Sequence, residues 1–165
     1  QRLPITLMEN VVSSAERRAY VLGEDTIIPR LSDLYAGLPS ITGKMELEYE
    51  GEMHGAEKIA RELISEAAGD TYHGRAGGAE VEEIVAYFEG GGALQVSDDS
   101  GGDACLSAFD SVTGLIALVE RVGLVAASAP AGVRAAACEL VLEALVAERR
   151  LSRIDGGYAK PPFQI

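Results

Sequence analysis

The segment Glu9-Asn10-Val11-Val12-Ser13-Ser14-Ala15-Glu16-Arg17-Arg18-Ala19 sets the helical character of the whole chain. Apolar residues recur in and beside it at steps of three and four, which is the period of an amphipathic helix. We therefore predict a helix over residues 6–22, with a left-handed cap at Gly23. Its inward stripe would be Met8, Val12, Ala15, Ala19 and Leu22, and its polar face Glu9, Ser13, Glu16 and Arg17.

A second helical pattern starts at Pro29-Arg30-Leu31-Ser32-Asp33-Leu34 and covers residues 29–38. Proline is favoured in the first turn of a helix, and the apolar residues that follow would face inward. Two short helices leave apolar surface that a further element must cover. Residues 56–72 are the clearest candidate, because a helical series runs through Ala56, Ile59, Ala60, Leu63, Ile64 and Ala67.

The stretch between these helices is ambiguous. Residues 45–50, Met-Glu-Leu-Glu-Tyr-Glu, alternate between apolar and acidic side chains, which is the period of a strand. A strand needs a partner, and none is evident nearby. An extended acidic segment after a helix is equally acceptable, so both interpretations stay open.

A glycine-rich segment at residues 73–78 follows the third helix and predicts a domain boundary, with one unit at 1–75 and a second at 79–165. The second unit begins with a short helix around Ile84 and Val85. A lone strand at 93–96, two helices at 103–112 and 113–122, and a longer helix at 133–149 follow.

The end of the chain predicts a β-hairpin, with strands at 151–154 and 158–160 around Asp155-Gly156-Gly157. A helix followed by a hairpin, with the earlier strand available to pair, is the layout of a winged helix. We therefore predict a mainly α fold, a helical unit followed by a small helical domain with a winged-helix-like hairpin.

Charge and composition narrow the class of protein. The chain has 165 residues and a formal net charge of −12, which argues against general nucleic-acid binding and against anionic membrane surfaces. Residues 76–133 carry one basic and nine acidic side chains. Nothing in the sequence reads as a signal peptide or a membrane helix, so we expect a cytosolic protein. Gln1-Arg2-Leu3-Pro4 is not a natural initiation sequence, so we expect a piece of a longer protein.

Candidate chemistry is sparse. There is no phosphate-binding Gly-x-x-x-x-Gly-Lys-Ser/Thr loop and no apolar strand leading to an acidic pair, so we expect neither ATP binding nor hydrolysis by this chain alone. His54 and His73 have no second ligand at helical spacing, and we expect no metal. Asp98, Asp99 and Asp103 depart from the calcium-loop pattern. Cys105 and Cys138 are expected to be buried free thiols.

The quoted segments carry a family resemblance. Residues 2–72, including Leu3-Pro4-Ile5-Thr6 and Ile41-Thr42-Gly43-Lys44, resemble the region after the ATPase core of bacterial AAA+ proteins, in the MoxR-like group labelled magnesium-chelatase-like. From residue 79 onward, Gly91-Gly92-Ala93-Leu94-Gln95-Val96 resembles the C-terminal extension of these proteins, with less distinctive motifs.

The resemblance implies the lid of an AAA+ ATPase and a C-terminal domain that contacts a protein partner. The parent protein would form a homo-oligomeric ring that uses ATP and Mg²⁺ to remodel that partner. Arg2 would sense the γ-phosphate of ATP. Glu16, Arg17, Arg18 and Asp33 would belong to the surface turned toward the nucleotide or a ring neighbour, although Arg17 and Arg18 read equally well as ordinary surface cations.

Two other functions stay open. The chain could be a transcription regulator whose winged helix binds DNA, because five cations fall in the last third, namely Arg134, Arg149, Arg150, Arg153 and Lys160. The net charge speaks against it. It could also be a metal-insertion subunit, although the sequence shows no ligand set for the metal.

Overall fold

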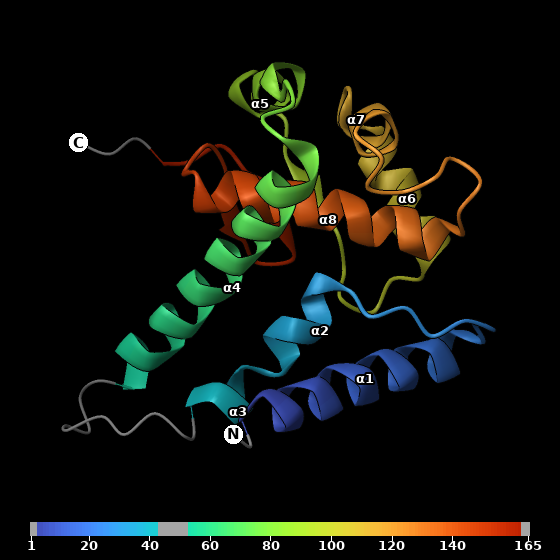
Figure 1. Ribbon diagram of the computed structural model, residues 1–165, viewed down its shortest axis with the longest axis vertical. Coiled ribbons are helices and arrows are strands. Elements are labelled where there is room, and N and C mark those ends of the chain that lie inside the picture. Colours follow the sequence, from blue (N-terminus) through green and yellow to red (C-terminus); the bar gives the residue numbers. More distant parts are fainter. Residues whose placement is uncertain (1–2, 43–52, 163–165) are drawn as a thin grey trace. The chain divides into compact units, whose positions relative to one another are not determined.

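The computed structural model describes residues 3–42 and 53–162 (Figure 1). Arg2 and the ambiguous segment at 45–50 lie outside these residues. The fold is mainly helical with one small antiparallel sheet, as predicted. The chain divides into two compact units, unit 1 at residues 1–65 and unit 2 at 66–165. The division falls within a helix, before the segment at 73–78 that the sequence predicts as a boundary.

Unit 1 is built from α1 (Leu3–Leu22), α2 (Leu31–Ala36), α3 (Leu38–Thr42) and the first part of α4 (Met53–Ala76). Helix α1 packs against both α2 and α3 (Figure 1). The single helix predicted at 29–38 is wrong, because Gly37 separates α2 from α3. A Cβ at Gly37 would lie 2.7 Å from Cδ1 of Leu7, so the missing side chain allows close approach to α1.

Only two of the five residues predicted to face inward on α1 are buried. Ala15 and Ala19 are buried, but Met8, Val12 and Leu22 are 68%, 39% and 43% exposed. The buried seam is rotated toward Val11 and Arg18 instead, because Arg18 turns inward to meet a carboxylate on α2. The predicted left-handed cap at Gly23 is confirmed, with a φ of 67°.

Helix α4 buries a narrower face than its sequence pattern suggests. The i, i+4 series of Ala56, Ala60 and Ile64 is buried, as predicted, whereas Ile59 and Leu63 are about half exposed. The helix also runs past residue 72 and ends where Gly77 and Gly78 adopt positive φ. Tyr72 is buried in the core of unit 2, which fixes these last turns as helix.

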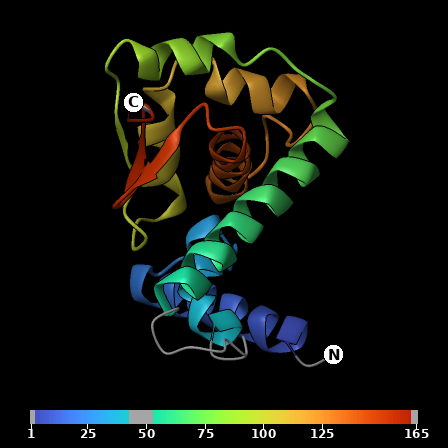
Figure 2. The same cartoon turned by 90° about the vertical axis from the view of Figure 1, so that its left-hand side faces the viewer.

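Unit 2 is arranged around one central helix, α8 (Ala131–Ala147). Helices α6 (Gly102–Asp110) and α7 (Leu115–Arg121) pack against it, and Figure 2 looks nearly along its axis. Helix α5 (Glu82–Glu89) adds Ile84, Val85 and Phe88 to the same core. The predicted helices at 103–112, 113–122 and 133–149 are thus confirmed within a few residues.

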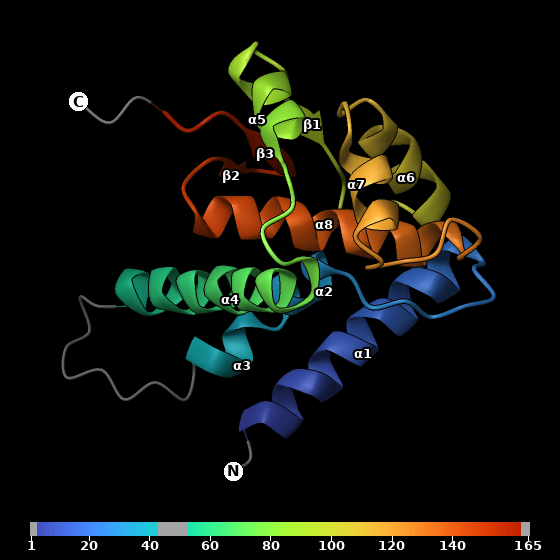
Figure 3. The ribbon, with the colours of Figure 1, turned by 45° about the horizontal axis from the view of Figure 1, so that its top comes forward.

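The sheet has the predicted hairpin and the predicted third strand. Strands β2 (Ser152–Ile154) and β3 (Gly157–Ala159) form the hairpin, and β1 (Leu94–Gln95) pairs with β3, giving the order β1-β3-β2 (Figure 3). Both partner strands are antiparallel to β3. A Cβ on Gly157 would fall 1.8 Å from the carbonyl oxygen of Leu94, so only glycine permits this pairing.

Candidate functional site

Two of the residues expected at a partner surface meet inside unit 1. Nη1 of Arg18 on α1 lies 2.6 Å from Oδ1 of Asp33 on α2, and the two side chains are 8% and 2% exposed. A buried ion pair is stable only when hydrogen bonds satisfy its remaining polar atoms. Arg18 is therefore not an ordinary surface cation, and neither Arg18 nor Asp33 lies on the surface where the sequence was expected to place them.

Each member of this ion pair makes a further hydrogen bond to the backbone. Nη2 of Arg18 donates to the carbonyl of Ile28 at 2.8 Å, and the backbone N–H of Arg30 donates to Oδ2 of Asp33 at 2.7 Å. Asp33 thus receives the side chain of α1 and the backbone that leads into α2. Arg18 and Asp33 therefore form a structural clasp of unit 1, because the charged groups of both side chains are bonded inside this unit.

The other expected partner residues are accessible. Glu16 and Arg17 are exposed on α1, and Arg2 lies outside the described residues. Next to Glu16 the same helix exposes Ile5 and Met8, at 60% and 68%. Together with Val12 they form a stripe at i, i+3 and i+7, which we call the α1 apolar face. The sequence pattern did not reveal it, because Met8 and Val12 were predicted to face inward and Ile5 precedes the helix predicted at 6–22.

A buried polar cluster in unit 2 was also missed by sequence reasoning. Glu143 on α8 is fully buried, and its Oε2 accepts a hydrogen bond from Nη1 of Arg153 at 2.9 Å. The hydroxyl of Tyr158 lies 3.0 Å from the same nitrogen and 3.4 Å from the same oxygen. The cluster joins α8 to both strands of the hairpin. Its sequence signal is a single glutamate within the otherwise apolar run Leu140–Val146 of a helix.

The cations of the last third are largely engaged by carboxylates. Arg134 pairs with Glu120, Arg153 pairs with Glu143, and Arg150 lies 3.7 Å from Glu82. Helix α8 itself is buried over most of its circumference. A helix in the centre of a core cannot enter a DNA groove, which needs an exposed basic face.

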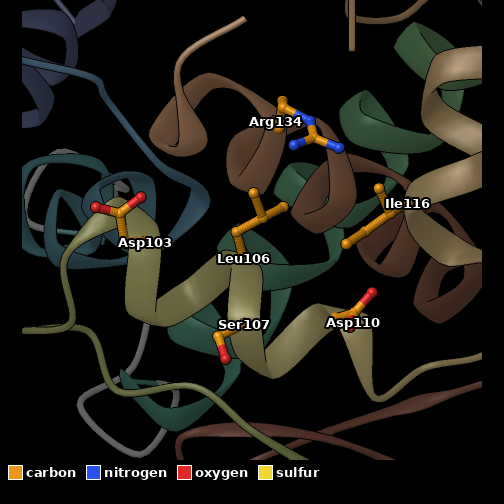
Figure 4. A pocket seen from close by; sticks show the side chains of 6 residues that line it. All are labelled: Asp103, Leu106, Ser107, Asp110, Ile116 and Arg134. Atoms are coloured by element: carbon orange, nitrogen blue, oxygen red, sulfur yellow. The ribbon is translucent and has the colours of Figure 1, made fainter. Parts of the chain in front are cut away.

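A shallow hollow of about 280 Å³ lies over α6, α7 and the start of α8 (Figure 4). Leu106 and Ile116 supply its apolar part, with Asp103 and Asp110 on either side of Leu106. Arg134 faces Leu106 across the hollow, and its charge is balanced by Glu120. The acidic groups of the hollow are therefore not neutralised by its one cation.

The described residues contain no group of three or more histidines, cysteines or acidic residues placed to hold a metal ion. Both cysteines are free and buried, as predicted. Burial raises the pKa of the Cys138 thiol to about 12, so this thiol is a poor nucleophile at neutral pH.

None of the helices in the described part of the chain is both long and apolar enough to cross a membrane. Helices α6 and α7 together reach that composition but are bent by 107°. Comparison of the chain with protein-family models, curated proteins and solved structures gave no match.

Proposed function

We propose that the chain is the lid and C-terminal partner-binding domain of a magnesium-chelatase-like AAA+ ATPase of the MoxR-like group. Unit 1 would be the lid and unit 2 the partner-binding domain. The proposal rests on the resemblance of residues 2–72 and 79–96 to this family, and it is supported by the all-helical build of the described part of unit 1.

The observation that carries the proposal is the α1 apolar face. Ile5, Met8 and Val12 stay 60%, 68% and 39% exposed, although the same helix also packs against α2 and α3. Burying one such side chain contributes about 1.5–3 kcal/mol, and a contiguous exposed stripe marks an interaction site. A lid that closes on an ATPase core needs such a face.

In this function ATP and Mg²⁺ would bind to the ATPase core of the parent protein, in the cytosol. Arg2 would contact the γ-phosphate, where a guanidinium stabilises phosphate charge and couples hydrolysis to lid movement. Glu16 lies one turn beyond Val12 on the side of the α1 apolar face. Glu16 and Arg17, both exposed, would contact the core or a neighbour in the homo-oligomeric ring. Arg18 and Asp33 would hold the lid together from within.

For unit 2 we propose a winged-helix-like domain that recognises a protein. The order helix, strand, helices, hairpin and the sheet order β1-β3-β2 suit this description. The DNA-binding alternative loses its main support, because α8 is central and the cations Arg134 and Arg153 are paired with carboxylates. A mobility shift with random duplex at low salt should show no complex, and clear binding would reverse this preference.

The decisive experiment uses the parent protein. The residues encoded before Gln1 should contain a phosphate loop and a following acidic pair, and their absence would end the proposal. If they are present, Arg2→Ala in the parent should lower ATP hydrolysis about 100-fold while ATP binding persists. Lys58→Ala, which removes an exposed cation of unit 1 that has no proposed contact with the core, is the control for a general charge effect. Equal activity of the Arg2 variant and the wild type would contradict the sensor role.

A further inference from the structure

The hollow over α6 and α7 has no role in the nucleotide chemistry proposed above. It combines an apolar base, Leu106 and Ile116, with two exposed carboxylates on α6 (Figure 4). Asp103 and Asp110 are seven residues apart on this helix, which is two turns or about 10 Å along its axis. Two carboxylates at this distance cannot share one metal ion, but they can meet two separate cations.

The charge around the hollow is one-sided. Among the described residues that line it, Arg134 is the one cation, and Glu120 balances that charge, so Asp103 and Asp110 leave an excess of two negative charges. The segment 76–133, which supplies α6 and α7, contains one basic and nine acidic residues. This field repels nucleic acid and anionic lipid and attracts a basic partner. A second copy of this chain, with a net charge of −12, would also be repelled.

We propose that the hollow docks a basic amphipathic helix of a partner protein. Such a helix would place Lys or Arg at i and i+7 against Asp103 and Asp110, and an apolar side chain at i+3 or i+4 against Leu106 and Ile116. The spacing of two turns on α6 is matched by the spacing of two turns on the partner. The inference rests on the proposed role of unit 2 in protein recognition and names the chemistry of the segment recognised.

The test is a titration of the isotope-labelled full chain with a synthetic helical peptide, followed by amide NMR. The peptide carries Lys at i and i+7 and Leu at i+3 and i+4 on an alanine-rich background. The amide signals of the chain that shift on binding should map to α6 and the start of α7. A peptide with Glu in place of both Lys residues should not bind, and Leu→Ala at both positions should weaken binding by several fold.

Variants of the chain separate a specific site from a general acidic field. Asp103→Asn with Asp110→Asn should raise the dissociation constant about fivefold, since two charge contacts with the peptide at a solvent-exposed surface are removed. The control, Asp98→Asn with Asp99→Asn, removes the same charge from exposed positions that do not line the hollow, and should change binding less than twofold. All four side chains are exposed, so folding should be preserved.

Three results would overturn the proposal. These are equal weakening by the two variant pairs, equal binding of the Glu peptide, and shifts that map outside α6, α7 and the start of α8, where Arg134 lines the hollow. The experiment does not involve ATP, so the hollow can fail as a docking site while Arg2 still senses nucleotide in the parent. The reverse outcome, peptide binding without any effect of Arg2→Ala, would leave the hollow intact and remove the lid function.

Discussion

The two units stabilise themselves in different ways. Unit 2 surrounds α8 with a continuous apolar core in which Phe109, Leu115 and Leu142 are completely buried. The second hydrophobic cluster, in unit 1, is much smaller and centres on Leu31, Leu38, Ala60 and Ile64. Unit 1 adds a buried ion pair, and it leaves the α1 apolar face open.

From this contrast we expect unit 1 to gain more stability from a covering neighbour than unit 2 does. Net stability of a domain is a small difference between burial and conformational entropy, so a unit with few buried side chains is marginal. Unit 2 buries enough apolar surface to be stable by its own packing. Unit 1 would gain stability when the face formed by Ile5, Met8 and Val12 is covered, which is the behaviour expected of a lid.

The largest expected effect comes from the core of unit 2. Phe109→Ala should lower the free energy of unfolding of this unit by about 4 kcal/mol, because a fully buried aromatic ring is lost. Ile64→Ala in unit 1 should cost about 2 kcal/mol, since its surroundings are less densely filled. Hydrogen exchange resolved by residue is the measurement. Equal loss of protection in both units after Phe109→Ala would show that they unfold together.

The ion pair of unit 1 gives the next effect. Arg18→Met should cost unit 1 about 3 kcal/mol, because Asp33 stays buried without its cation. Arg17→Met, one position earlier and exposed, should change stability by less than about 0.5 kcal/mol. The two variants are compared by urea unfolding, followed by amide hydrogen exchange in α1 and α2. Similar costs for both variants would refute the structural clasp.

Unit 2 should be weakened by alkali through Cys138. Burial raises the pKa of this thiol from its ordinary value of 9.0 to about 12, so the folded state keeps a proton that the unfolded state loses above pH 9. The free energy of unfolding should then fall by about 1 kcal/mol between pH 9 and pH 10. Burial also raises the pKa of Tyr72, which acts in the same sense.

The control for this pH dependence is Cys138→Ala, measured by urea unfolding at the same pH values. Its slope against pH should be shallower than that of the wild type, with the remainder due to Tyr72 and other groups. Unit 1 contains no cysteine, so its slope should not change with this substitution. An unchanged slope in unit 2 would show that Cys138 is not protected from ionisation by the fold.

The smallest effect concerns the end of α8. Arg149 has a φ of 60°, in the region where an L side chain is strained, and its N–H donates to the carbonyl of Val146 at 2.9 Å. Arg149→Gly should therefore stabilise unit 2 by about 0.5 kcal/mol in thermal unfolding. Arg150→Gly, without a positive φ, should destabilise it. A loss of stability in Arg149→Gly would mean that its side chain makes a contact worth more than the strain.

Sequence patterns located most elements within a few residues. The glycine cap at Gly23, the helices of unit 2 and the hairpin around Asp155-Gly156 are all local features. The functional residues were predicted less well. Glu16 and Arg17 are exposed as the proposed surface requires, whereas Arg18 and Asp33 are buried and paired with each other inside unit 1.

The errors share a cause. A helical period shows that a helix has an apolar side, but the side that is buried depends on the surfaces packed against it. On α1 the inward turn of Arg18 rotates the seam and leaves Met8 exposed. On α8 a glutamate, Glu143, is buried because the hairpin brings Arg153 to it from ten residues away.

Most helix ends and turns follow from backbone chemistry that acts over a few residues, so the sequence placed them within a few residues, although it missed the break at Gly37. The buried ion pair, the cluster at Glu143, the open face of α1 and the acidic hollow over α6 each join residues from separate elements. Their energies depend on burial and on the distance between charges, and these exist only once the elements have packed.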